Sequence, residues 1–183
     1  IGQWLPSECD LAKLGVPFVV KPSLGYGKRG VILDATQPSD LARSHREWPD
    51  LQYLIQQRIV PKILDGAPAY FRVFFVFGTI WCCWWNCFTD RYQSLLPAET
   101  EQFALQPLRD IVGRVAALTG MNFFSTEIAQ TEANEFILID YVNDQCHMLT
   151  QSANPAIGVP DEIVAGIARR LVEGAEQFLV GPR

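Results

Sequence analysis

The feature that most constrains the fold is a pair of apolar segments in the middle of the chain. Residues 71–77 and 80–88 are rich in aromatic and aliphatic side chains, and only Gly78 and Thr79 separate them. This pattern predicts two antiparallel strands joined by a two-residue turn. Because apolar residues fill successive positions rather than alternate ones, we expect a sheet that is covered on both faces. The apolar run is too short for a membrane helix, which needs about 20 residues.

The composition indicates a folded chain of one domain or two small lobes. Of the 183 residues, 49% are hydrophobic and 19% are charged, a balance unlike that of disordered chains. The net charge of −5 argues against nucleic acid as a partner, since an acidic surface is repelled by the phosphate backbone. No segment has the basic start and apolar stretch of a signal peptide. Five cysteines, an odd number, argue against a disulfide framework and predict a reducing, cytoplasmic compartment.

Predicted strands and helices are interspersed along the chain, which places it in the α+β class. Residues 17–22 and 30–34 predict two strands of a hairpin, whose tip is the glycine-rich segment 23–30. We call residues 23–30 the glycine hairpin. Further strands are predicted at residues 53–60, 123–129 and 135–142, and helices at residues 40–48, 108–118 and 161–178. Residues 62–68 have the composition of a linker and predict the boundary between two lobes.

The glycine hairpin contains Gly25-Tyr-Gly-Lys-Arg-Gly30, which fits the pattern G-x-G-x-x-G. In a dinucleotide-binding fold the last glycine opens a helix, whereas a strand follows here. Lys21 lies directly before the glycine hairpin, and Lys28 and Arg29 lie within it. Glycines let backbone N–H groups approach phosphate oxygens, and the cations would neutralise the phosphate charge. The segment therefore predicts either a phosphate-binding loop or an ordinary surface hairpin with solvated basic residues.

The order of these segments resembles the ATP-grasp superfamily, which includes D-alanine–D-alanine ligases and related carboxylate–amine ligases. Residues 17–31 look like the lysine-bearing strand and glycine hairpin of that family, and residues 54–61 look like its hinge strand. Residues 70–78 are similar to its arginine-bearing strand. Residues 120–128 and 136–143 resemble its paired metal-binding strands.

The resemblance implies that Mg²⁺ and ATP bind between two ATP-grasp lobes, residues 1–68 and 69–183. It implies catalytic roles for Lys21 and Arg72, which would stabilise charge on the transferred phosphoryl group. The nucleotide-binding residues that it implies are Lys21, Ser23, Gly25, Tyr26, Gly27, Lys28, Gly30, Gln56, Gln57, Arg58 and Ile59. The metal ligands that it implies are Glu127, Asp140 and Asn143.

The chain departs from the family's pattern at several positions. The hinge strand has Gln56 and Gln57 where the family commonly has acidic residues, which leaves the contact to the ribose open. Ser125 stands where an arginine is often found. Asp140 and Asn143 are three residues apart rather than two, so a regular strand would place them on opposite faces. A β-bulge is needed if both are to bind one metal ion.

The chemistry that the resemblance implies is an ATP-dependent ligation. ATP would phosphorylate a substrate carboxylate, and an amine or similar nucleophile would then attack the acyl-phosphate. Two alternatives remain open: a small-molecule kinase with the same fold, and a nucleotide-binding module without turnover. We expect a small-molecule or peptide carboxylate as the further partner, and no membrane. We also expect the chain to be a fragment, since it begins at Ile1 and lacks the family's N-terminal domain.

The cysteines allow two interpretations. Cys82, Cys83 and Cys87 could form a zinc site with Cys146 and His147, but no C-x-x-C pair is present. Free cysteines in apolar strands commonly pack as small apolar side chains. We therefore expect these residues to be buried thiols.

Overall fold

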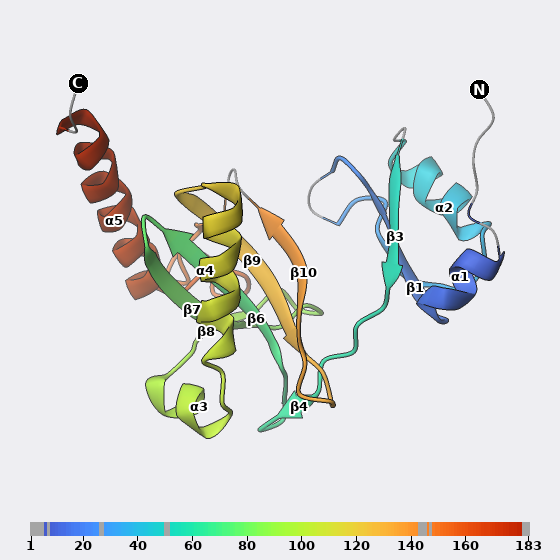
Figure 1. The fold of residues 1–183 in the computed structure, drawn as a ribbon, viewed down its shortest axis with the longest axis horizontal. Helices are drawn as coiled ribbons and strands as arrows, with labels where there is room; N and C mark the ends of the chain where they lie inside the picture. The colour runs from blue at the N-terminus through green and yellow to red at the C-terminus, as the bar shows by residue number, and fades with distance from the viewer. Residues whose placement is uncertain are drawn as a thin grey trace. The chain divides into compact units, whose positions relative to one another are not determined.

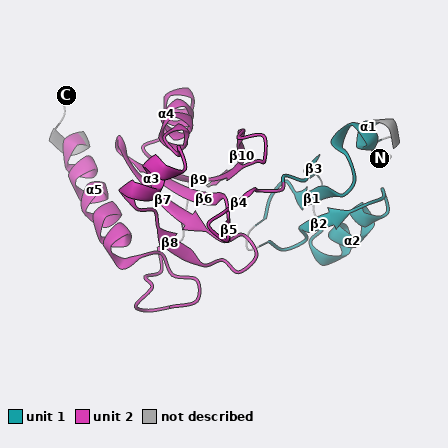
Figure 2. Cartoon of the chain, turned by 90° about the horizontal axis from the view of Figure 1, so that it is seen from below, with its two compact units in different colours: residues 1–59 teal, residues 60–183 magenta. Residues whose placement is uncertain are grey.

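The chain forms two compact units, residues 1–59 and 60–183 (Figure 2). The computed structural model describes residues 6, 8–25, 28–49, 52–142, 146 and 148–180. In these residues helices are combined with antiparallel sheets, which confirms the predicted α+β class. None of the described helices is long and apolar enough to cross a membrane.

The first unit is a three-stranded antiparallel sheet with helices on one face. The sheet order is β2-β1-β3, and α1 and α2 pack against it. The bounds of these elements are Glu8–Leu14 for α1, Phe18–Pro22 for β1, Ile32–Ala35 for β2, Asp40–Glu47 for α2 and Tyr53–Gln57 for β3. Phe18 and Val20 of β1 share a core with Leu11 of α1 and Leu41 of α2. The antiparallel pairing of β1 with β2 confirms the predicted hairpin.

The second unit is built on a five-stranded antiparallel sheet of order β10-β9-β6-β7-β8. The strands are β6 (Tyr70–Val76), β7 (Thr79–Trp85), β8 (Tyr92–Ser94), β9 (Phe123–Gln130) and β10 (Phe136–Val142). The helices are α3 (Pro97–Gln102), α4 (Pro107–Thr119) and α5 (Asp161–Val180). The pairing of β6 with β7, the pairing of β9 with β10, and helices α4 and α5 confirm the sequence patterns. The short elements α1, β8 and α3 were not predicted.

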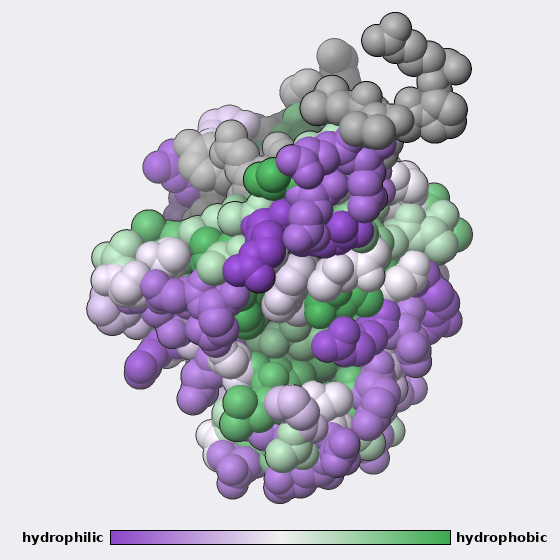
Figure 3. All heavy atoms as spheres, turned by 90° about the vertical axis from the view of Figure 1, so that its left-hand side faces the viewer, coloured by the Kyte–Doolittle hydropathy of each residue, from purple (hydrophilic) through white to green (hydrophobic). Residues whose placement is uncertain are grey.

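The five-stranded sheet is covered on both faces, as the unbroken apolar strands predicted. Phe71 and Val73 of β6 share a buried core with Leu108 and Val112 of α4. On the other face of β6, Phe74 is also buried, and α5 contacts this strand. Figure 1 shows α4 and α5 on opposite faces of the sheet. The side that carries α5 combines hydrophilic side chains with a smaller apolar area (Figure 3).

The turn between β6 and β7 lies one residue earlier than predicted. Val76 pairs with Thr79, so the connection consists of Phe77 and Gly78 rather than Gly78 and Thr79. Both turn residues have positive φ values, 44° and 86°, as expected of the two-residue turns that match the twist of a hairpin. At the far end of β7, the side chain of Asn86 accepts hydrogen bonds from following backbone N–H groups, and the strand ends at Trp85 instead of residue 88.

Residues 62–68 are not the linker that their composition indicated. They contain a small hairpin of β4 (Ile63–Leu64) and β5 (Ala67–Pro68), which turns at Asp65 and Gly66. Both turn residues have positive φ. The backbone N–H of Lys62 donates to the carbonyl of Gln130, which ties the hairpin to the end of β9. Polar turn residues therefore mark a hairpin here rather than a flexible connection.

Two helical glycines provide a matched test of how α5 packs. A Cβ at Gly174 of α5 would lie 2.2 Å from Cδ2 of Phe77, whereas a Cβ at Gly113 of α4 would meet nothing within 4 Å. We predict that Gly174→Ala lowers the free energy of unfolding by about 1–3 kcal/mol, because the added methyl group forces α5 away from the β6–β7 turn. Gly113→Ala should raise it by about 0.5–1 kcal/mol through helix propensity. Urea unfolding measures both, and stabilisation by both variants would contradict the packing of α5 on the turn.

Candidate functional site

A row of polar side chains crosses the sheet of the second unit. Arg72 of β6 is directly opposite Glu127 of β9, and Glu127 is directly opposite Asp140 of β10. Residues opposite one another on neighbouring strands project to the same face of a sheet. The structure thus brings three of the predicted site residues together on one face. Trp81 lies on that face too, and a Cβ at Gly166 of α5 would lie 3.1 Å from its indole nitrogen.

A β-bulge in β10 aligns Asp140 with this row. Leu138 pairs with Ile128 and Asp140 pairs with Glu127, so Ile139 is an extra residue without a partner in the register. In a regular strand Asp140 would be displaced by one residue and would project to the opposite face. A bulge between Asp140 and Asn143 was the condition for both residues to bind one metal ion, and the bulge that the described part of β10 shows lies before Asp140. Asn143 itself lies outside the described residues.

Glu127 is held by two side chains of β6. The Nη2 atom of Arg72 donates to Oε1 of Glu127 at 2.7 Å, and the hydroxyl of Tyr70 donates to Oε2 at 3.0 Å. The side chains of Arg72 and Glu127 are only 13% and 17% exposed. Nη1 of Arg72 also donates to the hydroxyl of Ser125. Each oxygen of the carboxylate therefore has a donor, and opposite charges compensate each other where little water reaches them.

Aromatic side chains surround this ion pair. The guanidinium of Arg72 lies over the ring of Trp85 at 4.7 Å, and the rings of Tyr70 and Trp85 are 5.4 Å apart. Burial and the neighbouring Glu127 raise the pKa of Tyr70 far above its usual range, so the phenol stays protonated and donates. The sequence interpretation missed Tyr70. Its position two residues before Arg72 was the available signal, because alternate residues of a strand share a face.

In the first unit, Lys21 lies on the face of the sheet that α1 and α2 leave uncovered. Lys21 pairs with Leu54, and Val19 pairs with Gln56, so these residues share that face. Gln57 pairs instead with Phe18, which faces the helices. The two hinge glutamines are therefore not equivalent, since Gln56 shares the face of Lys21.

The other predicted nucleotide-binding residues lie at the ends of these strands. Arg58 and Ile59 follow the last residue of β3 and are outside the strand, although a strand was predicted to continue to residue 60. Ser23, Gly25 and Lys28 are exposed, whereas Gly30 is buried. Lys28 and Gly30 have φ values of 61° and 69°. Tyr26 and Gly27 lie outside the described residues.

Cys82, Cys83, Cys87 and Cys146 are free thiols. Cys83 and Cys146 are buried, which confirms the packing interpretation for these two, and Cys82 and Cys87 are half-buried. Burial raises the pKa of Cys82 to about 11. No group of three or more His, Cys, Asp or Glu side chains in the described part of the chain could hold a metal ion. His147 lies outside that part, so the zinc alternative finds no support there.

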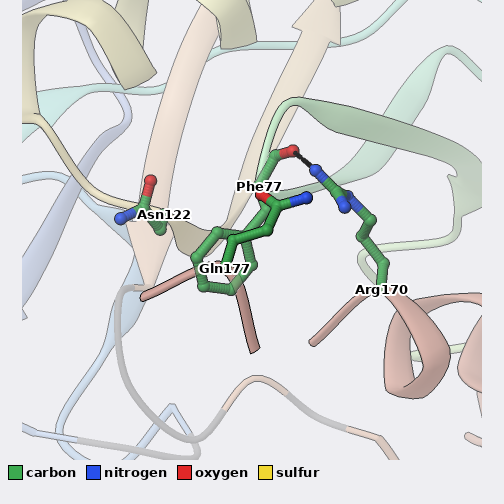
Figure 4. A pocket seen from close by; sticks show the side chains of 4 residues that line it. All are labelled: Phe77, Asn122, Arg170 and Gln177. Atoms are coloured by element: carbon green, nitrogen blue, oxygen red, sulfur yellow. Dashed lines mark hydrogen bonds between the residues drawn. The ribbon is translucent and has the colours of Figure 1, made fainter. Parts of the chain in front are cut away.

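A cavity of about 310 Å³ lies away from the polar row, beside the β6–β7 turn. It is lined by Phe77, Asn122, Arg170 and Gln177 (Figure 4). Arg170 donates to the backbone carbonyl of Phe77 through both Nε and Nη2. Phe77 is five residues beyond Arg72, which corresponds to roughly 16 Å along a strand. This cavity is therefore separate from the predicted site residues.

No protein-family model and no curated protein matches the sequence. Solved structures do match. The macrocyclase MdnC bound with precursor peptide MdnA, from Microcystis aeruginosa MRC, superimposes with a TM-score of 0.51 at 15% identity. The match covers 85% of this chain and 47% of that one. The ATP-grasp ligase PsnB, complexed with precursor peptide PsnA2 and AMPPNP, gives a TM-score of 0.51 at 12% identity and covers 87% of this chain and 47% of that one.

The chain has the ATP-grasp fold. The fold that the ordered motifs implied is thereby confirmed. The chain spans about half the length of each of the two solved structures.

The ion pair predicts a specific pattern of stability changes. Arg72→Met should lower the free energy of unfolding by about 3 kcal/mol, because it leaves the partly buried carboxylate of Glu127 without its cation. Adding Glu127→Gln should restore part of the loss, since no unpaired charge then remains. Urea unfolding of the single and double variants measures the coupling between the two residues. Losses that simply add would show that the two side chains do not stabilise each other.

Buried thiol and phenol groups predict a loss of stability in alkaline solution. Burial raises the pKa of Cys82 from 9 to about 11, and burial raises the pKa of Tyr92 from 10 to about 12. Above the ordinary pKa values the unfolded chain releases these protons while the folded chain retains them, so unfolding becomes more favourable as the pH rises. The melting temperature should fall between pH 9 and 12, and Tyr92→Phe should make the fall shallower. A constant melting temperature across this range would contradict the account.

Proposed function

We propose that this chain binds Mg-ATP and takes part in the ATP-dependent ligation of a carboxylate to an amine or similar nucleophile. The observation that supports this most is the row Arg72, Glu127 and Asp140, which lies on one face of the sheet of an ATP-grasp fold. A cation at this level of the sheet could bind a phosphate group of ATP, and two carboxylates could bind the Mg²⁺ that accompanies it. Because the chain covers half of the matched structures, the activity is proposed for the whole protein of which it forms part.

Glu127 and Asp140 fit the coordination that Mg²⁺ prefers. Magnesium is commonly held by one or two carboxylates, with phosphate oxygens and waters as the remaining ligands. Asp140 is exposed and directly opposite Glu127, so the two carboxylates could share one ion. Asn143 remains a predicted third ligand. When bound, Mg²⁺ would neutralise charge on the phosphates of ATP.

The residues of the first unit would bind the nucleotide itself. Lys21 would pair with phosphate oxygens, and Ser23, Gly25, Tyr26, Gly27, Lys28 and Gly30 would enclose them. The half-exposed side chain of Leu54 lies opposite Lys21 and offers an apolar surface beside it. Gln56, Gln57, Arg58 and Ile59 would contact the adenine and ribose, and Gln56 is the better placed of the two glutamines because it shares the face of Lys21.

The proposed reaction has two steps. A carboxylate oxygen of the substrate attacks the γ-phosphorus of ATP, the bond to the bridging oxygen breaks, and ADP and an acyl-phosphate form. A nucleophile then attacks the acyl carbon and releases inorganic phosphate. Lys21 and Arg72 would stabilise the negative charge that develops on the transferred group. The glycine hairpin would exclude water, which would otherwise hydrolyse the acyl-phosphate.

The two solved structures indicate a class of substrate. MdnC is bound with a precursor peptide, and PsnB is complexed with a precursor peptide and AMPPNP. By analogy we propose a peptide carboxylate as the substrate of this protein, with a small-molecule carboxylate as the alternative. The free thiols support a reducing, cytoplasmic environment.

The nucleotide site predicts a large effect at Lys21. Lys21→Met should weaken the binding of Mg-ATP at least about tenfold, because a charge-assisted contact to phosphate contributes about 1.5–3 kcal/mol. Lys13→Met is the matched control, since Lys13 is an exposed lysine of α1 that pairs with Asp10. Titration calorimetry with Mg-ATP measures both. Equal affinities for Lys21→Met and the wild-type protein would contradict the assigned role.

The ligase chemistry predicts a trappable intermediate. The full-length protein, supplied with Mg-ATP, a peptide carboxylate and hydroxylamine, should produce a hydroxamate, and Asp140→Asn should reduce its rate at least about 100-fold if the metal is required. Mass spectrometry detects the product. Binding of ATP without a hydroxamate from any peptide or small-molecule carboxylate would exclude ligation and favour a kinase or a binding module.

A further inference from the structure

Trp48, the residue directly after α2, contacts the start of the glycine hairpin. Its indole Nε1 donates a hydrogen bond to the backbone carbonyl of Leu24 at 2.9 Å. The same nitrogen lies 3.6 Å from the position that a Cβ of Gly25 would occupy. The indole therefore lies against the backbone where the chain leaves β1 and enters the glycine hairpin.

The same side chain also contacts the end of the glycine hairpin. A Cβ at Gly30 would lie 2.6 Å from the Cβ of Trp48, and Gly30 has a φ of 69°, so both space and conformation require glycine there. The guanidinium of Arg29 lies over the indole ring at 5.6 Å. Ser44, a fully buried residue one turn earlier in α2, donates its hydroxyl to the carbonyl of Gly30. The C-terminal end of α2 thus holds both ends of the hairpin.

Trp48 is itself fixed by the strand that contains the predicted adenine contacts. Its backbone carbonyl accepts a hydrogen bond from the hydroxyl of Tyr53 at 3.0 Å, and Tyr53 is the first residue of β3. Nδ1 of His45 lies 2.8 Å from the same hydroxyl. The backbone N–H of Trp48 donates to the carbonyl of Ser44. These bonds connect β3, the end of α2 and the glycine hairpin.

We propose that Trp48 is a positioning residue that restricts the glycine hairpin and thereby increases the affinity for nucleotide without touching it. Ordering a free backbone residue costs about 1–2 kcal/mol, so less entropy is lost on binding phosphates when both ends of the hairpin are already held. The contacts of Trp48 stand independently of any ligand, whereas the effect on affinity rests on the proposed function.

The first test measures the hairpin without nucleotide. Trypsin can cleave after Lys28 or Arg29, which are both exposed, at a rate that follows local opening. Trp48→Phe keeps the Cβ and an aromatic ring but removes the donor to Leu24. Cleavage at these two sites should become about fivefold faster, the factor that corresponds to a hydrogen bond of about 1 kcal/mol. Mass spectrometry identifies the sites.

Two controls separate a positioning role from a general loss of stability. Trp84→Phe, in β7 of the second unit and on the face opposite the row Arg72, Glu127 and Asp140, should leave cleavage of the glycine hairpin unchanged. Ser44→Ala removes the other side-chain donor to the hairpin and should accelerate cleavage at the same two sites. If Trp48→Phe instead accelerates cleavage at lysines and arginines throughout the chain, the residue stabilises the fold in general and the proposal is wrong.

The second test measures affinity for Mg-ATP by titration calorimetry. Trp48→Phe should raise the dissociation constant about fivefold, in line with the cleavage rate, and Trp84→Phe should not change it. Faster cleavage with unchanged affinity would overturn the positioning role. If the wild-type protein binds Mg-ATP and Trp48→Phe changes neither property, only this inference fails. If the wild-type protein does not bind Mg-ATP at all, the proposed function fails together with it.

Discussion

The arrangement of the second unit depends on the compensation of one charge. Arg72 lies in a strand whose other residues are almost all apolar, and the strand is covered on both faces, so its guanidinium needs a partner on the same face. Glu127 provides that partner only if β9 lies beside β6 in the observed register. The bulge at Ile139 then brings Asp140 to the same level. The pairing that stabilises the sheet is thus the pairing that assembles the candidate site.

The first unit depends on a constraint on the backbone conformation of the glycine hairpin rather than on the compensation of a charge. The glycine hairpin closes at Gly30, which has a positive φ and no space for a side chain beside Trp48. A short hairpin rich in glycine would be disordered if nothing held its ends, because glycine loses the most entropy on ordering. Trp48 and Ser44 hold those ends from the end of α2. The ends of the glycine hairpin are therefore held by Trp48 and Ser44, which lie outside the G-x-G-x-x-G motif.

The parts of the fold that could be predicted from the sequence are those specified by local patterns. Local patterns predicted the apolar strands on either side of a glycine and the helix that ends at Gly120 in the left-handed conformation. They also predicted the order of the ATP-grasp motifs. The hydrogen bond of Tyr70 and the contacts of Trp48 could not be predicted, because each joins segments that are distant in sequence. The position of the bulge at Ile139 could not be predicted either, because it depends on how β9 and β10 pair. The turn at Phe77 and Gly78 was misplaced by one residue, since only the pairing of the strands decides which residues adopt positive φ.

The central proposal is that Glu127 and Asp140, which the register of β6, β9 and β10 brings to one level beside Arg72, bind the metal ion that accompanies ATP. Paramagnetic broadening of backbone amide signals by Mn²⁺-ATP, measured on the isotope-labelled protein, tests this most directly. We predict that Glu127 and Asp140 both broaden at a low ratio of Mn²⁺-ATP to protein, and that diamagnetic Mg-ATP broadens neither. An absence of broadening at both residues would contradict the proposal.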